Sequence, residues 1–152
     1  MKIILEKNAL MNLVLASIEV YKKESFGFIL GFKDKQNFII KNALPFQTAK
    51  RTYLNVSMSP KKFASLSYVL SSLCNQTILG DYHTHTGNDV INHLSTIDKK
   101  DFIAKGIHAI TVLVNIKKTK RIQKWKVLKS KAISGTIQEY HITLKAYTVT
   151  NK

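Results

Sequence analysis

The chain of 152 residues is long enough for one domain with a hydrophobic core and too short for two ordinary domains. Apolar residues make up 45% of it, but no apolar run approaches the roughly 18 residues that a membrane-spanning helix needs. Polar residues from Glu6 to Asn8 argue against a cleavable signal peptide, and the single cysteine, Cys74, excludes an intrachain disulfide. We therefore expect a cytoplasmic protein, with delivery as an effector as the alternative.

The formal net charge of +15 is concentrated between Lys99 and Lys131. A basic surface attracts nucleic acid, anionic membranes or an acidic protein partner. The lysines are scattered through strand and turn positions, and basic residues do not interleave with aromatic ones outside Trp125. This pattern favours a generally basic surface, so an acidic partner ranks above nucleic acid.

The first half of the chain is predicted to hold two helices and three strands. Helical spacing of apolar residues predicts a helix over residues 8–23, with Asn8 as its N-cap. Apolar runs predict strands over residues 25–32 and 38–44, joined by a hairpin loop, and alternation predicts a strand over residues 51–58. Ser59 and Pro60 suit the N-cap and first turn of a second helix, whose apolar stripe is Phe63, Leu66, Leu70 and Leu73.

The second half is predicted to hold one helix between strands. The segments are a strand over residues 77–84, a loop over 86–94, a helix over 95–105 that ends at Gly106, and strands over 107–116, 122–128 and 140–149. About seven strands and three helices result from this reading. They predict a single α/β domain over residues 1–152, with helices flanking a curved mixed sheet.

Two histidines one residue apart, His83 and His85, project from the same face of an extended strand, about 7 Å apart at the backbone. A helix that begins at Ser95 can bring the Asp98 carboxylate to the same point. Two imidazoles and one carboxylate with a vacant fourth position form the open type of zinc site that enzymes use. Iron or manganese is an alternative, because geometry alone does not select the metal strongly.

Each of these residues also has an ordinary structural explanation. The two histidines can be surface residues at a strand end. Ser95 and Asp98 have the spacing of a capping box, in which the acid serves the start of a helix. Glu24 can be a solvated charge at the end of the first predicted helix.

Taken together, His83-x-His85 and Ser95-x-x-Asp98 resemble the metal motif of the JAMM (JAB1/MPN/Mov34) metalloprotease-like domain. An upstream segment, Glu24-Ser25-Phe26-Gly27-Phe28-Ile29-Leu30-Gly31, resembles that family's glutamate followed by an apolar strand with a Gly-x-x-x-Gly pattern. The resemblance runs from about Ile18 to about Val127 and is to a divergent, short prokaryotic or phage-type member. Thr86 and Leu94 stand where family members commonly have proline.

This resemblance implies an MPN-like fold and one zinc ion held by His83, His85 and Asp98. It implies that Glu24 is the general base for the attacking water and that the Ser95 hydroxyl stabilises the oxyanion. Two further residues are weaker candidates for supporting a ligand or contacting substrate: Asp81, which shares strand parity with His83, and His93, in the loop that follows.

The activity that the resemblance implies is that of a zinc-dependent metallopeptidase. Such an enzyme hydrolyses a peptide or isopeptide bond, as a deubiquitinase does at the C-terminus of a ubiquitin-like protein. The alternatives are a catalytically weak protein-binding module on the same fold and a toxin or effector domain. A basic nucleic-acid-binding protein ranks below these.

Overall fold

A computed structural model of the chain describes residues 2–35, 37–46, 50–51, 56–57, 59–87, 93–104 and 109–149. Within these residues, the elements in chain order are β1 (Lys2–Leu5), α1 (Lys7–Glu19), β2 (Phe26–Lys33), β3 (Asn37–Pro45), β4 (Lys50–Arg51), β5 (Val56–Ser57), α2 (Pro60–Leu73), β6 (Thr77–Thr86), α3 (Thr96–Ala104), β7 (Ile110–Lys118), β8 (Lys126–Val127), β9 (Ile133–Ile137) and β10 (Tyr140–Thr148). None of these helices has the length and apolar character to cross a membrane.

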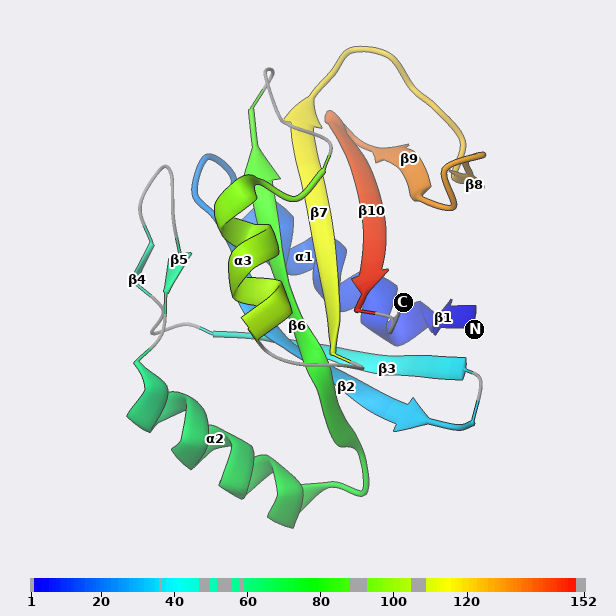
Figure 1. Cartoon of the computed structure of the whole chain (residues 1–152). Coiled ribbons are helices and arrows are strands. Elements are labelled where there is room, and N and C mark those ends of the chain that lie inside the picture. The colour runs from blue at the N-terminus through cyan, green and yellow to red at the C-terminus, as the bar shows by residue number, and fades with distance from the viewer. Residues whose placement is uncertain are drawn as a thin grey trace.

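Eight of the strands form one curved mixed sheet in the order β1-β3-β2-β6-β7-β10-β9-β8 (Figure 1). The pairs β1/β3 and β6/β7 are parallel, and the other neighbours are antiparallel. Two parallel neighbours need a crossover connection, and α3 lies in the one that joins β6 to β7. The predicted single α/β domain with a curved mixed sheet and three helices is confirmed at this level.

The two faces of the central strands pack against different helices, α1 behind β6 and β7 and α3 in front of them in Figure 1. On the α1 face, Leu13 is fully buried in one cluster with Val112 and Val114 of β7. On the α3 face, Phe102 packs with Leu113, the residue between those two valines. Full burial of one such side chain contributes about 1.5–3 kcal/mol, so both helices are fixed to the sheet by apolar contact.

The Gly-x-x-x-Gly pattern of β2 marks a close approach of two backbones. A β-carbon added at Gly27 would overlap the carbonyl oxygen of Leu44, and one added at Gly31 would overlap that of Ile39. Both oxygens belong to β3, the antiparallel neighbour of β2. The glycines therefore set how closely β3 lies against the strand that leads out of the Glu24 segment.

Several expected elements change in the structure. The first helix ends at Glu19, and the prediction of Asn8 as its N-cap is wrong: Glu6 stands there without a side-chain cap, because the chain enters α1 directly from β1. The single strand expected over residues 51–58 is also wrong. Arg51 pairs antiparallel with Val56, so the two ends of this segment belong to separate strands, and residues 52–55 lie outside the described part.

Sequence patterns also missed two strands of the large sheet. The strand expected over residues 122–128 shrinks to β8, while β1 and β9 were not expected. β9 contains Gly135, which weakens a strand pattern, but the Trp125 ring packs where a β-carbon at Gly135 would lie. In contrast, the second helix begins as predicted, with the Ser59 hydroxyl accepting a bond from the Lys62 N–H at 3.3 Å. Gly106, the expected end of the third helix, lies outside the described residues.

Replacing Gly31 with alanine should lower the free energy of unfolding by about 1–3 kcal/mol, because the added methyl group pushes β3 away from β2. Urea denaturation followed by circular dichroism measures the change. Ser65→Ala, at an exposed position of α2, serves as the control. A Gly31→Ala protein within about 0.5 kcal/mol of wild type would contradict this account of the glycine.

Candidate metal centre

The side chains of β6 alternate between the core and the α3 face of the sheet. Tyr82 and Thr84 are fully buried on the core side. His83 and His85 therefore project together from the opposite face, with their rings 5.1 Å apart between centroids. Their side chains are only 12% and 15% exposed, which argues against the interpretation as ordinary surface histidines.

Asp98, in the first turn of α3, completes a compact group with the two histidines. Its Oδ1 lies 3.5 Å from His83 Nε2, and its Oδ2 lies 3.4 Å from His85 Nε2. One potential ligand atom from each residue lies within 4.8 Å of the others. Two ligands of a tetrahedral zinc ion, each about 2.0–2.1 Å from the metal, stand about 3.3 Å apart. Each imidazole lies near this distance from one of the two carboxylate oxygens of Asp98.

The chemistry of this group fits a cation better than it fits a set of hydrogen bonds. His83 Nε2 is buried and makes no hydrogen bond among the described residues; its contact with Asp98 Oδ1, at 3.5 Å, is that of an ion pair. A buried polar atom left in that state costs about 1–3 kcal/mol. The neighbouring imidazoles of His83 and His85, with Ser95, hold the pKa of the Asp98 carboxyl well below its usual range, so the group is a carboxylate.

Ser95 and Asp98 also form the capping box that their spacing predicts. The Ser95 N–H donates to Asp98 Oδ2 at 2.8 Å, and the Asp98 N–H donates to Ser95 Oγ at 3.1 Å. The two explanations for this pair are therefore compatible. Oδ2 serves the helix start, Oδ1 stays available to a metal, and the Ser95 hydroxyl hydrogen stays available as a donor because its oxygen acts only as acceptor in the cap.

Glu24 reaches the group through a non-local pairing of the backbone. The Ser25 N–H donates to Thr84 Oγ1 at 2.6 Å, and the Thr84 N–H donates to the Ser25 carbonyl at 3.0 Å. These bonds extend the β2/β6 ladder by one residue beyond the pair Phe26 and His83. Glu24 directly precedes Ser25, and its carboxyl interacts electrostatically with His83, His85 and Asp98.

The Glu24 carboxyl is half-buried and interacts electrostatically with all three members of the group. Burial raises its pKa above the ordinary value; His83 and His85 act in the opposite direction, and the Asp98 charge adds to the rise. Glu24 is thus a partly desolvated carboxyl beside the histidines, in contrast to the expected alternative of a solvated charge. It does not belong to the group of close ligand atoms.

The two weaker candidates stand apart from the group of ligand atoms. Asp81 is buried in the sheet and accepts a bond from the Thr111 hydroxyl at 2.7 Å. His93 is exposed, directly before the buried Leu94. Neither a supporting role for Asp81 nor a substrate contact for His93 gains support from these positions.

One polar neighbour of the group was missed by sequence reasoning. Asn115 of β7 is the strand partner of His85 and is 6% exposed. Both polar atoms of its side-chain amide lack a hydrogen-bond partner among the described residues. A polar residue inside the apolar run of residues 107–116 is the signal that could have identified it.

No protein-family model matches the sequence, and no curated protein matches it. Among solved structures, the chain is similar to the solution structure of protein DSY2949 from Desulfitobacterium hafniense, with a TM-score of 0.60 and 16% sequence identity. The match covers 76% of this chain and 75% of the other. At that identity, the similarity concerns the fold alone.

Replacing Thr84 with valine should cost about 1–3 kcal/mol of unfolding free energy, because it leaves the buried Ser25 N–H without its acceptor. Thr86→Val, the same substitution at a half-buried position of β6, is the matched control and should change stability by less than about 0.5 kcal/mol. Chemical denaturation of both variants measures the difference. Equal effects at the two positions would contradict a specific role for the Thr84 hydroxyl.

Proposed function

We propose that the chain is a zinc-dependent metallopeptidase of the JAMM type that hydrolyses a peptide or isopeptide bond. The observation that supports the proposal is the convergence of His83, His85 and Asp98, which each offer one ligand atom within 4.8 Å of the others, with Glu24 beside them. Three protein ligands leave one tetrahedral position open, which is the arrangement of catalytic zinc sites. The order of these residues in the chain is that of the family's motif.

Each side chain has a definite task in this proposal. His83, His85 and Asp98 would hold a zinc ion, which would supply Lewis acidity and lower the pKa of a water molecule. Glu24 would accept a proton from the attacking water and return it to the leaving amine, a task helped by its raised pKa. The Ser95 hydroxyl would donate to the developing oxyanion while the Ser95 oxygen keeps its place in the cap.

The proposed substrate is a peptide, with the C-terminal segment of a ubiquitin-like protein as the specific case. That specific case depends on the family resemblance. What the sheet itself offers is a central strand, β6, whose two histidines project from one face, and the peptide would bind along that face in extended form.

Zinc should bind the purified chain in a one-to-one ratio and stabilise it. At a free zinc concentration about 1,000 times Kd, the gain is about 4 kcal/mol of unfolding free energy. His85→Ala should abolish this gain, while His93→Ala, which removes the exposed histidine outside the group, should retain it. Thermal unfolding with and without zinc, together with metal analysis, measures both. Equal loss in the two variants would contradict the assigned ligands.

Glu24→Gln should lower kcat by about 10²–10⁴-fold, because the amide cannot accept a proton, while zinc stoichiometry stays at the wild-type value. The assay uses a fluorogenic amide of a ubiquitin-like C-terminal peptide and an isopeptide-linked peptide. Glu19→Gln, an exposed glutamate at the end of α1, is the matched control. A zinc-loaded wild-type protein that hydrolyses neither substrate would refute the proposed reaction on these substrates, and an active Glu24→Gln protein would refute the role of Glu24.

A further inference from the structure

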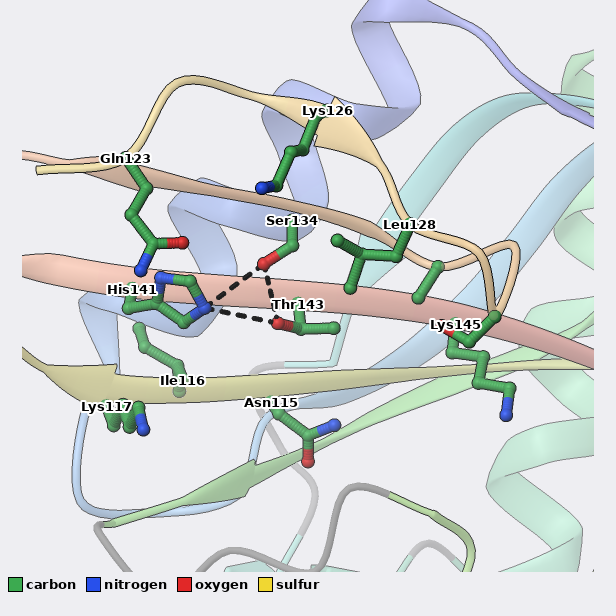
Figure 2. A pocket seen from close by; sticks show the side chains of 12 residues that line it. Asn115, Ile116, Lys117, Gln123, Lys126, Leu128, Ser134, His141, Thr143 and Lys145 are labelled. Carbon is green, nitrogen blue, oxygen red and sulfur yellow. Dashed lines mark hydrogen bonds between the residues drawn. The ribbon is translucent and has the colours of Figure 1, made fainter.

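A second polar site lies on the same face of the sheet as the metal group. It is a pocket of about 500 Å³ above strands β7, β10 and β9, shown in Figure 2. At its floor, Ser134 Oγ lies 2.9 Å from Thr143 Oγ1 and 3.1 Å from His141 Nε2. None of these residues has a role in the proposed catalytic group.

Strand register connects this pocket directly to the metal group. His85 pairs with Asn115, Asn115 with Thr143, Thr143 with Ser134, and Ser134 with Lys126. One row of polar side chains thus crosses five neighbouring strands, from β6 to β8. Neighbouring strands are about 4.8 Å apart, so Thr143 lies about 10 Å from His85 along the row, and an extended peptide covers that distance in about three residues.

Asn115 lies between the two sites, and the hydrogen-bonding groups of its side chain are unused among the described residues. It neighbours a proposed metal ligand on one side and lines the pocket on the other. Its buried amide has neither a donor nor an acceptor partner among the described residues. A buried amide of this kind costs about 1–3 kcal/mol unless a ligand or water satisfies it, which indicates a ligand that brings polar atoms to this point.

The charge of the pocket selects the kind of ligand. Lys117, Lys126 and Lys145 line it, and the described lining contains no acidic residue. Burial and the Lys117 charge lower the pKa of His141, which leaves the lysines as the cations. Phe, Tyr and Trp, which stack nucleic-acid bases, are absent from the described lining, so the pocket suits a carboxylate better than a nucleotide.

We propose that this pocket binds an acidic side chain of the peptide substrate, about three residues from the bond that is cut. Asn115 donates its amide N–H to the carboxylate at the inner end, and Lys126 and Lys117 neutralise the charge at the rim. The proposal rests on the proposed function for the position of the cut bond. The binding of an acidic peptide in the pocket is independent of hydrolysis and is tested without it.

The test measures peptide binding to the full-length Glu24→Gln protein by fluorescence anisotropy. The probes are a short fluorescein-labelled Gly/Ser peptide with a pair of glutamates and its counterpart with glutamines. We expect the glutamate peptide to bind at least about 10-fold more tightly, the effect of a hydrogen bond to a charged group. Equal affinity for the two peptides would overturn the proposal.

Two matched pairs of variants separate the pocket from the general positive charge of the chain. Asn115→Leu keeps the net charge and should weaken binding of the glutamate peptide by about 10-fold or more. Thr86→Val is its neutral control, at a half-buried position of β6 outside the pocket lining. Lys126→Gln and Lys61→Gln each remove one positive charge, but only Lys126 lines the pocket. Equal weakening by the two lysine variants would overturn the proposal.

Folding and ligand class are checked in the same series. Thermal unfolding establishes that Asn115→Leu is folded; should it not be, Thr143→Val replaces it as the variant of the pocket floor. A single-stranded oligonucleotide is the competitor: displacement of the glutamate peptide that disappears in Asn115→Leu would identify a nucleic-acid site and overturn the proposal. If the chain prefers the glutamate peptide but the wild-type protein hydrolyses neither assay substrate, the proposed reaction is refuted and the proposed peptide-binding pocket is supported.

Discussion

The alternation of side chains along β6 is the constraint on which the whole candidate site depends. Tyr82 and Thr84 are fully buried on the α1 side, so a slip of one residue would expose both and bury the two histidines in the core. Such a slip would forfeit several kcal/mol of apolar burial and leave imidazoles in an apolar core. The core on one face of the sheet therefore dictates the direction of His83 and His85 on the other.

In α3, the Asp98 carboxylate serves both the helix start and the group with the histidines. A capping box fixes one carboxylate oxygen of Asp98 on the helix start, and this leaves the second oxygen pointing toward His83. The cap contributes about 1 kcal/mol to the helix and restricts the carboxylate rotamer. In the opposite direction, His83 Nε2 is buried without a hydrogen bond among the described residues, which lowers stability. The candidate site thus combines a fixed carboxylate with a buried polar atom that lowers stability, a combination that is typical of functional sites.

Local patterns predicted what local interactions control. The second helix has its N-cap serine and its proline in sequence, and the buried strands around Ile29 and Val112 are apolar runs, so these elements appear where expected. The spacing of Ser95 and Asp98 likewise predicted their capping box. In contrast, the placement of Glu24 beside the histidines depends on bonds between Ser25 and Thr84, 59 residues apart, which no spacing in the sequence reveals. The family resemblance supplied that expectation, and β1, with only four residues and a lysine at its start, gave no pattern to read.

The polar row from His85 to Lys126 shows why composition alone does not identify the partner of this positively charged chain. Its members come from five separate strands and are scattered over residues 85–143, so in the sequence they are isolated polar residues within apolar or basic stretches. A net charge of +15 alone is compatible with nucleic acid and with an acidic protein. Strand register favours an acidic protein over nucleic acid. It gathers hydroxyls, lysines and an amide without a hydrogen-bond partner among the described residues on the face that carries the histidines. The described pocket lining contains no Phe, Tyr or Trp. In the proposed function, such a face would discriminate by local charge and hydrogen bonding at a fixed distance from the histidines, which is what the selection of a peptide requires and the holding of a polyanion does not.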